Sequence, residues 1–145
     1  MDDEKMSKSL KNFFTIRDVL KNYDGETLRY FLISSHYRSP LNYSKTNIDG
    51  AQSALKRLYN AINGLNKKVD DVSTIDTNFK ERFNSALNDD FNTPMALSIL
   101  FEIAKQINIE RTNNPNKASA LSIQLVELGN YLGILEYDAD EYLKQ

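Results

Sequence analysis

The sequence predicts an all-α fold, in which short helices precede an antiparallel helical bundle. Apolar residues recur at steps of three and four along most of the 145 residues, and this spacing places them on one face of a helix. Residues that begin or end helices, among them Thr93-Pro94 and Gly133, stand at the ends of these periodic stretches. No strand-like alternation of any length competes with this pattern.

The two helices at the start of the chain are short. Thr15 and Asp18 have the spacing of a capping box and predict a helix that ends near Tyr23. Asp24 is the expected N-cap of a second helix, which ends near Ser35.

A longer third helix begins after Ser44, its expected N-cap, and runs to about Leu65. A polar loop over residues 63–77 precedes a fourth helix from about Asn78 to Leu87. The apolar stripes of these two helices predict buried residues, namely Ile48, Ala51, Leu55, Leu58, Ile62 and Leu65 in the third and Phe79, Phe83 and Leu87 in the fourth.

The fifth helix begins at Thr93-Pro94, with the Thr93 hydroxyl as its cap, and continues to about Arg111. Asn114-Pro115 separates it from a sixth helix that ends near Gly133. A last helical turn or two is expected near residues 138–143. The predicted core positions are Leu97, Leu100, Ile103, Ala104 and Ile107 in the fifth helix and Leu121, Leu125, Leu128, Leu132 and Leu135 in and after the sixth.

Composition excludes several kinds of protein and site. The chain has no cysteine and one histidine, His36, so disulfides, thiol nucleophiles and Cys/His metal sites are excluded, and we expect no metal ligands. No apolar run approaches the roughly 20 residues of a membrane span, and the first residues lack the apolar stretch of a signal peptide. A cytoplasmic protein without a membrane partner is therefore expected.

The net charge of −2 conceals a gradient along the chain. Residues 1–60 carry ten Lys/Arg and seven Asp/Glu, a net of +3, whereas residues 61–145 carry eight and thirteen, a net of −5. Such a basic first part suggests a surface that faces a polyanion, which is a weak signal alone.

One segment, Lys5-Met6-Ser7-Lys8-Ser9, suggests chemistry of its own. Two lysines and two hydroxyls within five residues are suited to binding a polyphosphate, because lysine is a compact positive charge and serine supplies hydrogen bonds. Such a loop stabilises the charge that builds on a leaving pyrophosphate. From composition alone, a solvated basic tail is the more common explanation.

This pentapeptide resembles the KMSKS signature of class I aminoacyl-tRNA synthetases. The residues that follow resemble the cysteinyl-tRNA synthetase family specifically, in an ordered set that covers residues 5 to about 104. The set comprises Asn12-Phe13-Phe14-Thr15-Ile16-Arg17-Asp18-Val19-Leu20, Asp24-Gly25-Glu26-Thr27-Leu28-Arg29-Tyr30-Phe31-Leu32, Ser35-His36-Tyr37-Arg38-Ser39-Pro40-Leu41-Asn42-Tyr43-Ser44 and Leu87-Asn88-Asp89-Asp90-Phe91-Asn92-Thr93-Pro94.

The resemblance implies ATP-dependent activation of cysteine and its transfer to the 3′ end of tRNA. Lys8 matches the lysine expected to contact the ATP phosphates and is the one catalytic residue implied, while Lys5, Met6, Ser7 and Ser9 complete the ATP-binding loop. Lys11, Arg29 and Arg38 are candidate tRNA contacts, although Arg29 and Arg38 are equally able to pair with nearby carboxylates. The implied cofactors are ATP with Mg²⁺, and zinc only in a catalytic domain outside this chain.

The resemblance also implies how the chain is divided. Residues 1–43 would form the KMSKS loop and a stem-contact region, and residues 44–145 a tRNA-binding helical bundle of the DALR type. We expect the family's nucleotide-binding catalytic domain to be covalently linked and absent here, so that this chain alone is inactive; a monomer is favoured. The alternative is a stand-alone, non-catalytic helical module that binds tRNA or a protein partner.

Two further predictions concern polar residues outside the loop. His36 is expected to have a structural role, or to lie near tRNA, rather than to act in catalysis. Asp89 and Asp90 are expected to form the loop and cap before Thr93 rather than a metal site.

Overall fold

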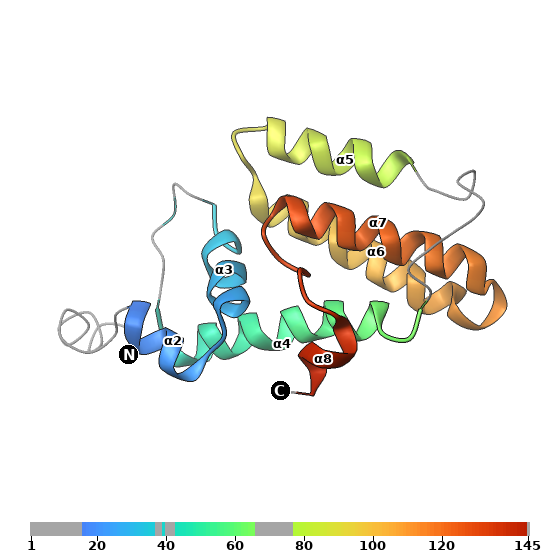
Figure 1. The fold of residues 1–145 in the computed structure, drawn as a ribbon. Helices are drawn as coiled ribbons and strands as arrows, with labels where there is room; N and C mark the ends of the chain where they lie inside the picture. The colour runs from blue at the N-terminus through green and yellow to red at the C-terminus, as the bar shows by residue number, and fades with distance from the viewer. Residues whose placement is uncertain (1–15, 37–38, 40–42, 66–76, 145) are drawn as a thin grey trace.

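The computed structural model describes residues 16–36, 39, 43–65 and 77–144 (Figure 1). These residues form helices and no strand, which confirms the predicted all-α fold. The helices are α2 (Ile16–Asn22), α3 (Gly25–Ile33), α4 (Lys45–Ile62), α5 (Thr77–Asn88), α6 (Thr93–Asn113), α7 (Pro115–Tyr131) and α8 (Ala139–Leu143).

Helices α3 and α4 begin at the predicted caps. The Asp24 carboxylate accepts the Thr27 N–H at 3.3 Å, and the Ser44 hydroxyl accepts the Asn47 N–H at 3.1 Å. Both helices end slightly earlier than predicted, α3 at Ile33 and α4 at Ile62. The predicted cap of α2, Thr15, lies outside the described residues.

The start of α6 corrects one prediction. The N-cap is Asn92, whose side-chain oxygen accepts the Met95 N–H at 3.1 Å, and not the hydroxyl of Thr93. The reason is that the helical hydrogen bonds begin one residue earlier than predicted, with the Ala96 N–H donating to the Asn92 carbonyl. Pro94, predicted at the first helical position, is the second residue of α6, still in the first turn, where its missing N–H leaves no helical bond unmade.

Helices α6 and α7 form an antiparallel hairpin that turns at Asn114 (Figure 1). The end of α7 has the hydrogen bonds of a Schellman motif: the Gly133 N–H donates to Asn130 O, and the Ile134 N–H donates to Gly129 O. Gly133 has φ +79°, a conformation that glycine adopts without strain. The predicted end of the sixth helix near Gly133 is thereby confirmed.

A single buried core joins α2 and α3 to the bundle. Helix α4 packs against α3, α6, α7 and α8, and α6 packs against α5 and α7. Nearly all of the predicted core positions are buried, while Ile62, Leu65, Phe79 and Leu87 are partly buried against the core. Because Val19 and Leu28 belong to the same core, the structure has no apolar boundary between the first helices and α4. The division at residues 43 and 44 stays a prediction.

No helix in the described ranges is long and apolar enough to cross a membrane.

Candidate functional site

Most of the predicted site residues lie outside the described residues. These are the candidate ATP loop, Lys5, Met6, Ser7, Lys8 and Ser9, and the candidate tRNA contacts Lys11 and Arg38. Arg29 is the described member of the set, on α3. What the structure describes is therefore the helical region that follows the loop and how that region is held.

Arg29 links α3 to the end of α7. Its Nε donates to the carbonyl of Leu132 at 2.9 Å, and Leu132 is the C-cap of α7. A cation at this position satisfies a helix-terminal carbonyl and complements the negative end of the helix dipole. The side chain is nonetheless exposed, so a role for Arg29 toward tRNA stays a prediction.

A buried carboxylate, Glu26, holds the chain that follows α7. One of its oxygens accepts the Tyr59 hydroxyl at 2.7 Å and the Leu135 N–H at 3.1 Å, and the other accepts the Glu136 N–H at 2.9 Å. The N–H of the next residue, Tyr137, donates to the Tyr59 oxygen at 3.3 Å. Such a set of donors is what allows a carboxylate to be buried, since without partners its transfer from water is strongly unfavourable.

The backbone after α7 has an uncommon conformation at Leu135, one of the residues whose N–H binds Glu26. Leu135 has φ +60°, a left-handed conformation that is uncommon for a residue with a side chain. The cost of that conformation, of the order of 1–3 kcal/mol, is met by surrounding contacts such as those to Glu26.

Helix α8 docks on the first turn of α3 through Tyr142. Its hydroxyl donates to the Asp24 carboxylate at 3.0 Å, and its ring stacks on Tyr59 with centroids 4.1 Å apart. Burial raises the pKa of the Tyr59 and Tyr142 hydroxyls well above the ordinary tyrosine value, and hydrogen bonds to Glu26 and Asp24 add to the shift. Both hydroxyls therefore stay neutral donors at physiological pH.

A second polar contact lies where α3 approaches the turn before α6. The Nε2 atom of His36 lies 3.7 Å from an oxygen of Asp90, within ion-pair distance when the imidazole is protonated. Asp90 and Phe91 have φ values of +55° and +52°, and the Phe91 side chain is 70% exposed. Asp89 and Asp90 lie in the turn that leads to the α6 cap, as predicted, and no group of three His, Asp or Glu side chains among the described residues could hold a metal ion.

Sequence reasoning identified Asp24 as a cap but missed the cluster formed by Asp24, Glu26, Tyr59 and Tyr142. These residues belong to α3 and its N-cap, to α4 and to α8, and the last of these lies more than 75 residues from the others in the sequence. Helical periodicity marks positions on a single helix, so it carries no signal for polar contacts between distant segments. Glu26 alone offered a hint, as a carboxylate on the apolar side of α3.

Two family models match the chain in succession. The model of the class I (C) tRNA synthetase catalytic domain matches residues 1–53, and the model of the DALR domain matches residues 82–136. The first match covers the candidate ATP loop, α2, α3 and the first turns of α4.

Individual relatives match almost the whole chain. Cysteine–tRNA ligases of Haemophilus influenzae (strain 86-028NP), Shewanella woodyi and Tolumonas auensis are 52%, 51% and 50% identical over 144 residues. These alignments cover 99% of this chain and 31% of each relative, so the chain spans about a third of the length of the curated relatives it matches.

Proposed function

Because the chain belongs, over 99% of its length, to the cysteine–tRNA ligase family, we propose that it supplies the ATP-phosphate loop and the tRNA-facing helices of such a ligase. In the proposed reaction the carboxylate of cysteine attacks the α-phosphorus of ATP and pyrophosphate leaves. A hydroxyl at the 3′ end of tRNA then attacks the activated carbonyl, and AMP leaves. The observation that carries the proposal is the 50–52% identity to these ligases over 144 residues, a stretch that includes both the loop and the helical region.

In this proposal Lys8 binds the ATP phosphates and stabilises the charge that develops on the leaving pyrophosphate. Lys5, Met6, Ser7 and Ser9 complete the loop, whose ammonium and hydroxyl groups suit a polyphosphate. Mg²⁺ would accompany ATP as its counter-ion. Lys11, Arg29 and Arg38 are the proposed tRNA contacts.

Zinc does not fit this chain. A structural or catalytic zinc site needs Cys, His or carboxylate ligands in a cluster, and the sequence has no cysteine and a single histidine. A zinc ion of the ligase would therefore be held outside these residues. The proposed state is a monomer.

The cluster around Glu26 supports the proposal indirectly. Helix α3 follows the loop by about 16 residues, and its first turns are bonded to α4, to the end of α7 and to α8. These bonds fix α3, which follows the loop in the sequence, against the bundle, and a fixed α3 would help to hold one tRNA while its 3′ end reacts.

A chimaera tests the proposal. The matching residues of the Haemophilus influenzae ligase would be replaced by these 145 residues, and cysteine-dependent ATP–pyrophosphate exchange and tRNA charging would be measured. We expect rates within about tenfold of the unreplaced ligase, or about 1.4 kcal/mol in activation free energy. A control chimaera with residues 5–9 changed to a glycine–serine loop should lose exchange. A folded chimaera without exchange, from a chain that still binds tRNA, would favour the non-catalytic module instead.

A further inference from the structure

An open groove of about 770 Å³ lies between α4 and α6. Arg57 and Asn60 of α4 line one side, and Lys105 and Asn108 of α6 line the other. All four of these polar side chains are exposed. None of them belongs to the Glu26 cluster or to the candidate residues drawn from the sequence, so the groove is a separate surface.

Two cations line the groove, and no described carboxylate pairs with either of them. Neither Arg57 nor Lys105 forms an ion pair with another described residue. Instead, the Arg57 guanidinium lies 5.0 Å from the centroid of the Phe101 ring, which also lines the groove. A cation held over an aromatic ring keeps its charge and its outward-facing donors.

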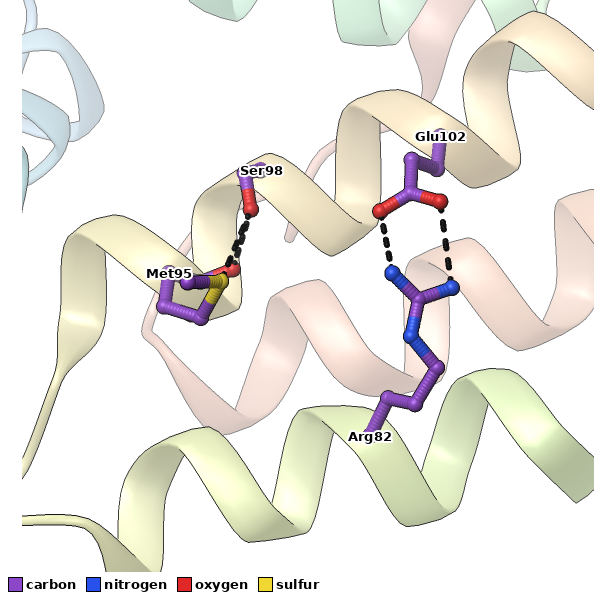
Figure 2. Close-up of polar contacts among 4 residues, drawn as sticks. All are labelled: Arg82, Met95, Ser98 and Glu102. Atoms are coloured by element: carbon purple, nitrogen blue, oxygen red, sulfur yellow. Dashed lines mark hydrogen bonds and ion pairs between the residues drawn. The ribbon is translucent and has the colours of Figure 1, made fainter.

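Glu102, the one acidic side chain among the described residues that line the groove, is already paired. The Arg82 guanidinium of α5 binds both of its oxygens, one of them at 3.0 Å (Figure 2). Figure 2 shows the two groups facing each other in the fork-to-fork arrangement that gives bidentate pairs their directionality. Among the described residues that line the groove, Arg57 and Lys105 thus carry two positive charges, and Glu102, the one negative charge, is paired with Arg82 of α5.

The chemistry of the groove suits an RNA strand. Its cations match phosphates, its two Asn amides donate to and accept from ribose and base edges, and its half-buried aromatic ring offers a stacking surface. The lining along α6 runs from Ser98 to Ile109, about 16 Å at 1.5 Å per residue, which is enough for a few nucleotides. Phosphate, ribose and base together match all three kinds of group, whereas the carboxylates of an acidic peptide match the two charges.

We propose that the α4–α6 groove binds the tRNA backbone, with Arg57 and Lys105 each contacting a phosphate. This inference rests on the proposed function, in which the chain acts on tRNA, and adds a surface that is distinct from Lys11, Arg29 and Arg38. Asn60 and Asn108 hydrogen-bond to the same stretch of RNA.

Charge-removing variants test the two phosphate contacts. The 145-residue chain and its Arg57→Gln and Lys105→Gln variants would be titrated against a fluorescein-labelled cysteine tRNA transcript at several salt concentrations. Each variant is expected to lower the slope of log affinity against log salt by about 0.7–0.9 and to weaken binding about five- to eightfold at 0.1 M salt. The matched control is Lys56→Gln, which removes the same charge from the neighbouring residue of α4 outside the groove and should change binding less than about twofold.

The outcomes separate the two proposals. If the unaltered chain shows no salt-dependent tRNA binding, both the tRNA-facing function and the groove assignment fail. If the chain binds but Arg57→Gln and Lys105→Gln behave like Lys56→Gln, the groove assignment fails and the function stands. Displacement of tRNA by poly-glutamate as efficiently as by unlabelled tRNA would assign the groove to an acidic peptide and overturn the inference.

Because the chain has no cysteine, a single introduced thiol can test directly where bound tRNA lies. Asn108→Cys creates the single thiol of the chain, to which an iron–EDTA probe can be attached. Bound tRNA should then be cleaved over a short, defined stretch. The control is Glu127→Cys on α7, a residue that does not line the groove and that faces Lys80 of α5. Equal cleavage from both positions, or none from Asn108→Cys, would overturn the inference.

Discussion

The Tyr59 hydroxyl donates to the Glu26 carboxylate at 2.7 Å, and both residues are buried. The same carboxylate accepts the N–H groups of Leu135 and Glu136. One side chain of α3 thereby binds α4 and the segment between α7 and α8. Helix α3 is the second described helix after the candidate ATP loop in the sequence. Movement of α3 would break these charge-assisted bonds, which are buried.

Glu26→Gln should destabilise the fold markedly. The amide has one accepting oxygen, and its NH₂ group cannot accept, so at least one of the donors around it loses its partner. We expect the free energy of unfolding to fall by about 1.5–3 kcal/mol, measured by urea denaturation followed by circular dichroism. Glu136→Gln changes an exposed side chain and leaves the backbone N–H that binds Glu26 in place, so this variant should stay within about 0.5 kcal/mol of the unaltered protein. Equal midpoints for the two variants would show that the Glu26 bonds contribute little.

Alkaline pH should unfold the protein through its buried tyrosines. Burial raises the pKa of Tyr30 to about 12 and raises those of Tyr59 and Tyr142 further, whereas an unfolded tyrosine titrates near pH 10. Above about pH 10 the unfolded chain thus binds fewer protons than the folded chain. The stability from these groups is complete below pH 10 and is lost as the pH rises toward 12.

A variant of Tyr142, the buried tyrosine of α8, separates this effect from general alkaline unfolding. Tyr142→Phe keeps the ring stack but removes one hydroxyl, so its unfolding free energy should be lower at pH 8 and fall less steeply between pH 9 and 11.5. Tyr131→Phe, at a side chain that is 68% exposed, should retain the pH dependence of the unaltered protein. Parallel curves for all three proteins would contradict the raised pKa of Tyr142.

Two glycines should respond in opposite directions to alanine. Gly133 has φ +79°, and a Cβ there would lie 2.9 Å from Nε of Arg29, the atom that bonds the end of α7. Gly133→Ala should therefore cost about 1–2 kcal/mol. Gly50 lies within α4 with nothing near its Cβ position, so Gly50→Ala should add about 0.5–1 kcal/mol. Thermal melts of both variants check the signs, and a stabilising Gly133→Ala would refute the strained-cap explanation.

The sequence was sufficient for the helices and their apolar faces, because each helix carries its own period, cap and stop. Errors were local. The cap of α6 was assigned to Thr93 in place of Asn92, since both are good capping residues and only the first helical hydrogen bond distinguishes them. Helix α3 ends earlier than predicted, with Ser34 as its C-cap, and α4 ends earlier because Asn63 has an extended conformation and Gly64 has φ +82°.

Contacts between segments that are distant in the chain could not be predicted from the sequence. Arg29 was expected to meet either phosphate or a carboxylate, and the structure bonds it to the Leu132 carbonyl. Arg57 and Lys105 belong to different helices, so no spacing brings them to one groove; only the packing of α4 on α6 does. The types of residue in the sequence do not indicate which side chain binds a distant backbone carbonyl or which helices form a groove.

Replacing Lys8 in the chimaeric ligase tests whether this segment is the ATP loop. Lys8→Ala should lower cysteine-dependent ATP–pyrophosphate exchange on the order of 10²- to 10³-fold, the usual cost of removing one group that stabilises developing charge. Its affinity for tRNA should change little, and Lys144→Ala, at an exposed lysine of the α8 C-cap, should leave both quantities unaltered. Exchange at the unaltered rate in the Lys8→Ala chimaera would contradict the assignment of this segment as the ATP loop.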